Sequence, residues 1–442
     1  MAYKVGMVSL GCPKNQMDAE LMLARLEQAG YTLTADAALA DVVIVNTCGF
    51  IEDAKKESID QILEFAQLKK EGRIQRIIVT GCLAERYQEE LAAELPECDG
   101  VLGLGANRDI AEAVKTVLAG APVVRFPDKG CWDLDGQRVQ TTPSFFAYLR
   151  VGDGCNNRCA YCAIPLIRGP LRSRGMEALV DEARSLAAAG VKELVLVAQD
   201  TTLYGQDWDG ASHLPELLDR LCEIDGLKWI RLLYCYPEHI TDDLLGTMAR
   251  QDKVVKYMDI PIQHASGAVL ASMNRPGDEA SLRALMAHIR ERVPGIVLRT
   301  TVMTGFPGET EEQFEQLCTF VRDMRFERLG CFAFSPEEGT KAATMAGQVP
   351  EQEKQRRRDV IMQEQALVAA RYNEEQIGRT LEVLVESYDR YAGCWFGRSA
   401  ADAPDIDGKV FFSAPKGAVR AGDMVRITIT DALDWDLMGD IV

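Results

Sequence analysis

Basic residues are scarce in this chain: its 442 residues include 49 Lys and Arg against 67 Asp and Glu, and the formal net charge is −18. The shortage excludes a broad surface for nucleic-acid phosphates, because such a surface needs clustered Lys and Arg. A negative field would instead speed the approach of a basic partner, although solubility alone explains the charge equally well.

Long apolar runs and secretion signals are also missing. No stretch approaches the roughly 18–20 apolar residues that span a bilayer, so no membrane segment is expected. Met1 to Cys12 lacks a basic segment followed by a long apolar run, so no signal peptide is expected. The 13 cysteines are an odd number spread through a long chain, unlike the disulfide framework of a small secreted domain. We therefore expect a cytoplasmic location.

Residues 1–120 alternate strand and helix patterns, which predicts a doubly wound parallel sheet and an α/β domain. The predicted strands are Lys4–Leu10, Asp41–Asn46, Arg76–Thr80 and Gly100–Leu104. Residues 121–143 carry prolines, glycines and scattered charge, and are expected to form a linker.

Residues 144–349 repeat the alternation on a longer scale, and six β/α units predict a partial (β/α)6 barrel. Its predicted strands are Ala147–Val151, Glu193–Ala198, Trp229–Leu233, Tyr257–Ile260, Val297–Thr301 and Arg328–Phe332. Residues 350–377 predict a charged connector helix, with Arg356–Arg358 on a solvated face. Residues 378–442 show short strand patterns between turns, typical of a small all-β barrel or sandwich.

Three cysteines lie in one short loop, Cys155-Asn-Asn-Arg-Cys159-Ala-Tyr-Cys162. Three thiolates at this spacing can hold three corners of a 4Fe-4S cluster and leave the fourth iron without a protein ligand. An open iron can bind a substrate or cofactor, so the loop indicates reactive chemistry rather than electron storage. The alternative is structural zinc, which needs four ligands, and the next Cys or His is His213.

Three further cysteines occupy equivalent places, because Cys12, Cys48 and Cys82 each follow a predicted strand. The carboxyl ends of parallel strands lie on one edge of a sheet, so these cysteines should converge in space. They predict a second three-cysteine cluster, again with one open iron. The alternative is three ordinary buried cysteines.

Two polar groups near the predicted barrel admit two interpretations each. Gln199 and Asp200 follow a barrel strand and either bind a cofactor or cap the next helix. Arg168, Arg172 and Arg174 follow the cysteine loop and either pair with a carboxylate of cofactor or substrate, or form a solvated basic loop.

The loop Cys155–Cys162, with Tyr161 before its last cysteine, resembles that of the radical S-adenosylmethionine superfamily. With Cys12, Cys48 and Cys82 and a C-terminal β domain that resembles the TRAM module, the whole chain resembles the methylthiotransferases. The other matching stretches are Ser9-Leu-Gly-Cys12-Pro-Lys-Asn15, Asn46-Thr-Cys48-Gly-Phe50, Gly154-Cys155-Asn-Asn157, Ala198-Gln199-Asp200-Thr201, Asp259-Ile-Pro-Ile-Gln263-His264 and Gly305-Phe-Pro-Gly308-Glu309.

The resemblance implies two 4Fe-4S clusters and S-adenosylmethionine, with Tyr161, Gln199 and Asp200 as cofactor-binding residues. One S-adenosylmethionine would methylate sulfur at the N-terminal cluster, and another would give a 5′-deoxyadenosyl radical at the Cys155–Cys162 loop. The cofactors carry this chemistry, so no side chain is singled out as catalytic. The electron donor and the sulfur source stay unidentified.

Two branches of the family differ in substrate. One modifies an adenosine in transfer RNA, and the other modifies the β-carbon of an aspartate in the twelfth protein of the small ribosomal subunit. The stretch Ser9 to Asn15 resembles the second branch. The tail, residues 378–442, holds seven Lys or Arg and eleven Asp or Glu. This acidic tail suits a basic ribosomal protein better than phosphates, so transfer RNA is not expected as a direct substrate.

Two functions of other classes stay open at this point. The protein could be an iron–sulfur carrier that only transfers electrons, or an RNA-binding module. The long predicted barrel and the aromatic residue in the cysteine loop argue against a simple carrier. The acidic balance of the chain argues against RNA binding.

Overall fold

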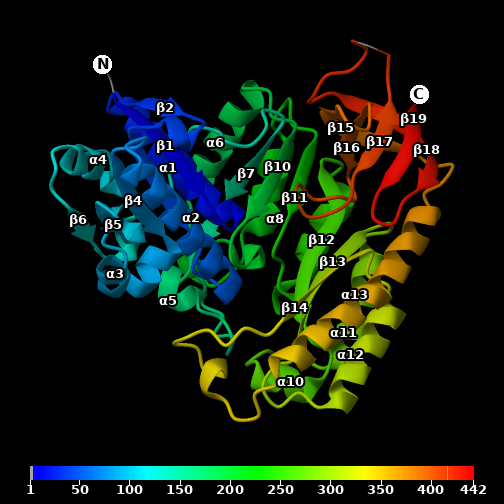
Figure 1. The fold of residues 1–442 in the computed structure, drawn as a ribbon. Helices are drawn as coiled ribbons and strands as arrows, with labels where there is room; N and C mark the ends of the chain where they lie inside the picture. The colour runs from blue at the N-terminus through cyan, green and yellow to red at the C-terminus, as the bar shows by residue number, and fades with distance from the viewer. Residues whose placement is uncertain (1–2, 416) are drawn as a thin grey trace. The chain divides into compact units, whose positions relative to one another are not determined.

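The computed structural model describes residues 3–415 and 417–442, and the chain forms two compact units. The N-terminal unit comprises Met1–Thr141, Gly152–Arg174 and Ser335–Ala343. The barrel unit comprises Thr142–Val151, Gly175–Phe334 and Thr344–Val442. Figure 1 shows the elements of both units in chain order. No helix within residues 3–415 and 417–442 is both long enough and apolar enough to cross a membrane.

The N-terminal unit contains a parallel sheet of six strands in the order β2-β1-β3-β4-β5-β6. The strands are β1 (Lys4–Ser9), β2 (Thr32–Thr34), β3 (Val42–Thr47), β4 (Arg76–Gly81), β5 (Gly100–Leu102) and β6 (Val123–Arg125). The order reverses between β1 and β3, which is the topological switch point of such a sheet.

Helices cover both faces of this sheet (Figure 1). They are α1 (Pro13–Gln28), α2 (Glu52–Lys70), α3 (Cys82–Glu94) and α4 (Ile110–Leu118). Alternate residues of β3 point to opposite faces, as strand geometry requires. Val42 and Ile44 belong to the core under α1 and α4, whereas Val43 and Val45 belong to the core under α2 and α3. The doubly wound prediction is therefore confirmed.

Residues 121–143, predicted as a linker, pack against this sheet and helix α1. Strand β6 pairs with β5, and Arg138 donates a 2.7 Å hydrogen bond to the buried Glu20. Trp132 is buried, and its Nε1 donates to the Asp18 carboxylate at 2.8 Å. The segment thus adds an edge strand and core contacts to the N-terminal unit.

The barrel unit contains a second parallel sheet, in which the strands follow chain order. They are β7 (Phe146–Arg150), β10 (Glu193–Val197), β11 (Trp229–Leu232), β12 (Val254–Gln263), β13 (Val297–Thr304) and β14 (Arg328–Ala333). Within the described residues β7 and β14 do not pair, so the sheet stays open. The partial barrel predicted from the sequence is confirmed.

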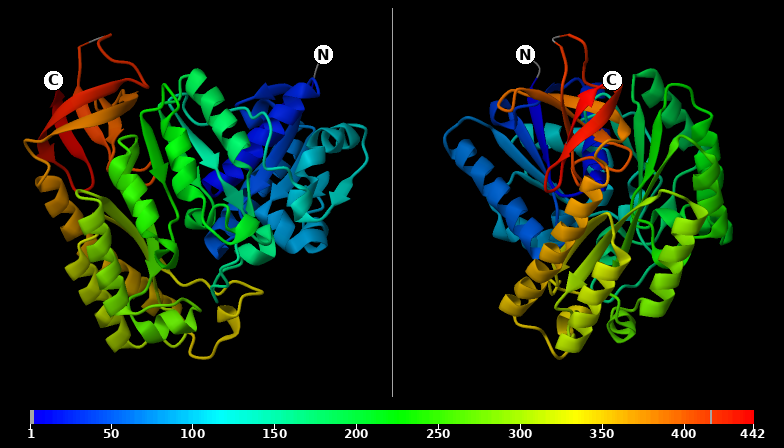
Figure 2. Two further views of the ribbon diagram at one scale, coloured as in Figure 1. Left: turned by 180° about the vertical axis from the view of Figure 1, so that it is seen from behind. Right: turned by 90° about the vertical axis from the view of Figure 1, so that its right-hand side faces the viewer.

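Helices follow the barrel strands and contact one another in a row, which ends with the long helix α13 beside α12 (Figure 2). They are α6 (Met176–Ala188), α7 (Gln206–Asp209), α8 (Leu214–Cys222), α9 (Asp242–Arg250), α10 (Gly267–Ser272), α11 (Glu279–Arg292), α12 (Glu311–Met324) and α13 (Glu351–Glu374). The expectation that Arg356–Arg358 forms a solvated face is wrong for Arg357. That side chain is buried and pairs with Glu309, Glu311 and Glu353, because α13 packs on β14 and α12.

The C-terminal residues form a small closed barrel in the order β15-β16-β17-β19-β18. The strands are β15 (Thr380–Asp389), β16 (Cys394–Ser399), β17 (Val410–Ser413), β18 (Met424–Ala432) and β19 (Leu437–Ile441). Its core consists of alternating apolar residues such as Val383, Val385, Ile427 and Ile429. The closed barrel confirms the all-β prediction and leaves no unpaired strand edge.

Buried ion pairs link this small barrel to strands of the parallel sheet. Glu193 on β10 receives 2.7 Å hydrogen bonds from Arg231 on β11 and from Arg398 on β16. Burial would raise the pKa of Glu193, but the charges of Arg398 and Arg231 outweigh it and lower that pKa. A second pair joins Arg328 to Asp402 at 2.6 Å. We call these residues the junction charges.

Candidate functional site

Cys12, Cys48 and Cys82 follow three strands that are neighbours in the N-terminal sheet. Cys12 precedes helix α1 after β1, Cys48 comes directly after β3, and Cys82 is the first residue of α3 after β4. Because β1, β3 and β4 are adjacent and parallel, all three cysteines leave the sheet at one edge. Two of them flank the switch point, where open α/β sheets bind ligands.

Glycines bring the three cysteine segments together. Gly11 has a φ of +89°, and a Cβ on it would lie 2.8 Å from the Sγ of Cys48. A Cβ on Gly49 would lie 2.9 Å from the carbonyl carbon of Cys82. Since no side chain fits at either position, the segments approach as closely as backbones allow.

The three thiols influence one another electrostatically. Burial raises the pKa of the Cys82 thiol to about 12, Arg168 opposes this, and Cys12 and Cys48 add to it. Burial also raises the pKa of Cys48, and Cys12 contributes in the same direction. Metal binding at such a site must displace protons, because thiolates are the ligands.

The loop Cys155–Cys162 belongs to the same unit and is held by backbone hydrogen bonds. It lies between β8 (Gly152–Asp153), which pairs with β9 (Arg172–Ser173), and the short helix α5 (Ile164–Arg168). The Cys155 amide donates to Gly169 at 3.0 Å, and the Ala342 amide donates to Ala160 at 2.8 Å. Cys155 and Cys159 are buried, and Tyr161 and Cys162 are half-buried.

Burial raises the pKa of the Cys162 thiol to about 12, and the charge of Lys14 opposes this rise. No three ligating side chains among the described residues already stand in metal-binding geometry. The donor sets fit 4Fe-4S clusters, since each presents three thiols without a nearby fourth.

Arg168 follows the Cys155–Cys162 loop in the chain and contacts Cys82, a member of the other cysteine set. Its buried guanidinium contacts the Asp18 carboxylate at 2.7 Å and the Asp153 carboxylate at 3.4 Å. Its Nη2 lies 3.4 Å from the Sγ of Cys82. Arg172 lies 3.7 Å from Asp153, and Arg174 pairs with Asp135 at 2.6 Å. A solvated basic loop is thus wrong for these arginines, because carboxylates distant in sequence pack against them.

Gln199 and Asp200 lie in the barrel unit, directly after β10. The Asp200 carboxylate accepts hydrogen bonds from the amide and hydroxyl of Thr202 and so caps the following turn. It also lies 2.9 Å from Nδ1 of His239. Burial lowers the pKa of His239, but the contact with Asp200 outweighs it and raises that pKa. The capping interpretation holds for Asp200, and cofactor binding by Gln199 and Asp200 stays a prediction.

The structure also brings together two stretches that the sequence singled out only as family motifs. The His264 ring accepts from the Ser266 amide through Nδ1 at 2.9 Å, so its Nε2 donates towards Glu309, 3.3 Å away. Asp259 accepts from the Tyr234 amide at 3.0 Å and from Arg299 at 2.8 Å.

Tyr234 and Gln263 have φ values of +62° and +69°, a strained conformation for non-glycine residues. Such strain often occurs at functional sites, but the residues around Tyr234 and Gln263 do not predict a positive φ. The only signal in the sequence was the motif Asp259 to His264 itself.

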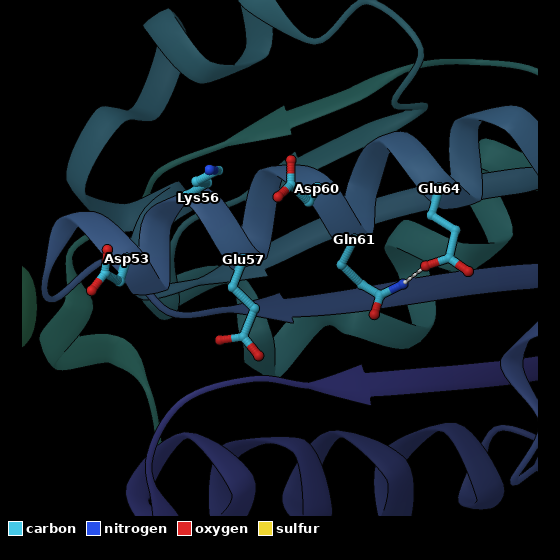
Figure 3. Close-up of a pocket in the computed structure, with 6 residues that line it drawn as sticks. All are labelled: Asp53, Lys56, Glu57, Asp60, Gln61 and Glu64. Carbon is cyan, nitrogen blue, oxygen red and sulfur yellow. Dashed lines mark hydrogen bonds between the residues drawn. The ribbon is translucent and has the colours of Figure 1, made fainter.

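A surface hollow lies along helix α2 and is lined by Asp53, Lys56, Glu57, Asp60, Gln61 and Glu64. Figure 3 shows these side chains, with a hydrogen bond between Gln61 and Glu64. None of them belongs to the cysteine sets or to the predicted cofactor residues. Acidic side chains on an exposed helix face are ordinary solvated groups, so the hollow receives no function here.

Three family models match successive parts of the chain. They are "Uncharacterized protein family UPF0004" at residues 4–103, "Radical SAM superfamily" at residues 149–321 and "TRAM domain" at residues 377–442. Among solved structures, the chain resembles the radical S-adenosylmethionine methyltransferase TsrM from Kitasatospora setae with a TM-score of 0.57. The identity is 16%, with 86% of this chain and 81% of that chain covered, so this likeness concerns the fold alone.

Curated relatives match over the full length. "Ribosomal protein uS12 methylthiotransferase RimO" from Pelotomaculum thermopropionicum is 50% identical and covers 100% of both chains. The protein of that name from Geobacter sulfurreducens is 48% identical, with 99% of this chain and 98% of the relative covered. Such identity over the whole length establishes the family. The chain belongs to the ribosomal protein uS12 methylthiotransferases, a family of radical S-adenosylmethionine enzymes.

Proposed function

We propose that this protein adds a methylthio group to the β-carbon of an aspartate in the ribosomal protein uS12. The observation that carries the proposal is the 50% identity, over the full length of both chains, with a relative named for this activity. The two three-cysteine sets in one unit support it, because the reaction combines two kinds of cofactor chemistry.

Six cysteines would hold two 4Fe-4S clusters, in the sets Cys12, Cys48, Cys82 and Cys155, Cys159, Cys162. Tyr161, Gln199 and Asp200 would bind S-adenosylmethionine. When bound, these groups supply one-electron cleavage of a sulfonium, removal of hydrogen from a C–H bond and transfer of a methylated sulfur. The chain itself supplies thiols in threes, so that one iron of each cluster has no protein ligand.

Burial is the second contribution of the chain. Cys48, Cys82, Cys155 and Cys159 are buried, and the Cys155–Cys162 loop is fixed to Gly169 and Ala342 by backbone hydrogen bonds. A fixed and dry site excludes water from reactive groups and keeps them oriented.

The substrate is a ribosomal protein rather than transfer RNA under this proposal. The names of the relatives favour it, and so do the net charge of −18 and the acidic tail. A basic protein complements such a field, whereas phosphates are repelled by it. Cytoplasmic location, an electron donor and a sulfur source, the last two unidentified, complete the proposal.

Mass analysis of ribosomal proteins from cells with and without the gene tests the substrate. The expected result is a methylthio mass increase on one aspartate of uS12 that disappears without the gene. Unmodified uS12 together with altered transfer RNA would reverse the choice of substrate.

A second experiment separates the enzyme from a simple electron carrier. Anaerobic incubation of the iron-loaded protein with S-adenosylmethionine and a chemical reductant should yield 5′-deoxyadenosine. Its absence in protein with intact clusters would contradict the radical mechanism.

A further inference from the structure

We propose that Arg168, which follows the Cys155–Cys162 loop in the chain, is a positioning residue that sets the reduction potential of the cluster held by Cys12, Cys48 and Cys82. The inference rests on the proposed function in one respect, since it requires that these cysteines bind a cluster. It adds a residue to that site which none of the cysteine motifs contains.

The position of Arg168 in the chain is the first argument. It ends helix α5, six residues after Cys162, and so directly follows the loop Cys155–Cys162, which we call the radical loop. Its Nη2 nevertheless lies 3.4 Å from the sulfur of Cys82, a member of the other set. The same nitrogen lies 3.4 Å from Oδ1 of Asn15. The Nδ2 of Asn15 donates hydrogen bonds to the backbone carbonyls of Asn46 and Thr47.

The surroundings of Arg168 hold the guanidinium in place. Asp18 of helix α1 and Asp153 of β8 approach it from two elements, at 2.7 and 3.4 Å. Trp132 in turn donates to Asp18 at 2.8 Å. Arg168 and both carboxylates are almost completely buried. A planar guanidinium braced in this way presents a fixed N–H group to the sulfur.

The charge of Arg168 is retained in spite of its burial. Arginine stays protonated in proteins, and the carboxylates of Asp18 and Asp153 lie beside the guanidinium at 2.7 and 3.4 Å. A permanent positive charge therefore lies beside a predicted cluster ligand in a dry environment, where electrostatic interactions are strong.

Such a contact has a direct consequence for a bound cluster. Reduction adds one negative charge, which a neighbouring cation and an N–H group directed at a ligand sulfur both stabilise. Removing the guanidinium should therefore make the cluster harder to reduce. Since Arg168 follows the radical loop in the chain, its placement also depends on the segment that carries Cys155, Cys159 and Cys162.

The test uses the full chain in which Cys155, Cys159 and Cys162 are replaced by Ala, so that only the N-terminal cluster is reconstituted. In this background, Arg168→Gln is compared with Arg172→Gln by potentiometric titration with electron paramagnetic resonance detection. Arg172 is the matched control, because it faces Asp153 and the carbonyls of Gly130 and Trp132 and, within the described part of the chain, does not contact a cysteine sulfur.

Arg168→Gln should lower the ratio of reduced to oxidised cluster at a fixed potential about tenfold, which equals a midpoint about 59 mV lower for one electron. Arg172→Gln should leave the midpoint unchanged. A third variant, Arg168→Lys, keeps the charge without the planar fork and should shift the midpoint in the same direction by less.

An unchanged midpoint in whichever Arg168 variant keeps its iron, or an equal shift in Arg172→Gln, overturns the proposal. Failure of the proposed function looks different. If the background protein folds but binds no iron at all, Cys12, Cys48 and Cys82 hold no cluster, and the error lies in the assignment of the site rather than in Arg168.

Discussion

The two cysteine sets of the N-terminal unit are assembled in opposite ways. Cys155, Cys159 and Cys162 come from one loop of eight residues, so their proximity is guaranteed by chain connectivity. Cys12, Cys48 and Cys82 span 71 positions and come from three strand ends, so their proximity exists only when the sheet is folded. The first set, which we call the loop set, depends on local sequence. The second, which we call the tertiary set, depends on the folded sheet.

This difference predicts which perturbations separate the two sites. Ligand replacement should remove either set cleanly, whereas a change in packing between strand ends should affect only the tertiary set.

Replacing Cys155, Cys159 and Cys162 by Ala should abolish 5′-deoxyadenosine formation. It should leave about half of the bound iron, because under the proposed function the second set would hold its own cluster. Iron analysis and product chromatography measure both effects. A matched triple variant at Cys131, Cys222 and Cys394, none of which is a predicted ligand, should keep its iron. Complete loss of iron from the first variant with an intact fold would show that the tertiary set binds nothing.

Gly11→Ala should disrupt the tertiary set alone. Its φ of +89° is strained for alanine, at a cost of about 1–3 kcal/mol, and the new Cβ would meet the Cys48 sulfur. We expect loss of about half the iron, with cleavage of S-adenosylmethionine retained.

Gly30→Ala is the control for backbone strain, because Gly30 has a φ of +87° with nothing within 4 Å of an added Cβ. It should lower stability to a similar extent and keep all the iron. Equal iron contents in the two variants would argue against the clash as the cause.

Glu337→Gln tests how local the loop set is. Glu337 is buried in the segment Ser335–Ala343, and it pairs with Arg86 at 2.8 Å and Lys55 at 3.2 Å. Lys55 keeps Glu52 at 2.6 Å, but the Arg86 side chain loses its acidic partner, which should lower the free energy of unfolding by about 3–5 kcal/mol, measured by denaturant titration. Iron at the loop should persist, and its loss would mean that the loop depends on this segment through the contact of Ala342 with Ala160.

The control for Glu337→Gln is Glu364→Gln. Glu364 pairs with Arg322 at the surface, where the side chains are 27% and 57% exposed. An exposed ion pair contributes about 0–1 kcal/mol, so this variant should be close to wild type in stability.

Asp200→Asn tests whether Asp200 and His239, which follow neighbouring strands of the barrel sheet, interact electrostatically as the thiols of the N-terminal sheet do. The pKa of His239 is raised in the folded state, so the pair stabilises the fold fully below the unfolded pKa and less as pH rises through the folded pKa. The variant should lose about 1 kcal/mol at pH near 5 and little at pH 8. Unfolding titrations at both pH values measure this, and a loss independent of pH would contradict it.

The sequence predicted the long central strands to within a few residues, because continuous apolar runs between turns mark them clearly. Predicted Arg76–Thr80 became Arg76–Gly81, and Glu193–Ala198 became Glu193–Val197. It missed the three-residue edge strands Thr32–Thr34 and Val123–Arg125, which are too short for periodicity to reveal. These edges form because a neighbouring strand offers backbone hydrogen bonds.

The candidate site was predictable where chemistry follows from spacing or from strand ends. The partners of Arg168 were not predictable, because Asp18 and Cys82 lie 150 and 86 positions away and only the folded chain brings them near. The positive φ values of Tyr234 and Gln263 were not predictable either, because neither residue is a glycine, the residue type that favours such values.

The junction charges have a consequence for modularity. A tail of this kind is easily regarded as an exchangeable adaptor, but Glu193 of the parallel sheet pairs with Arg398 of the tail as well as with Arg231, and Arg328 pairs with Asp402. A tail from another protein would leave Glu193 and Arg328 buried without their partners from the tail, unless Arg398 and Asp402 were transferred with it. A chimera that exchanges the tail should therefore keep Arg398 and Asp402 at their places.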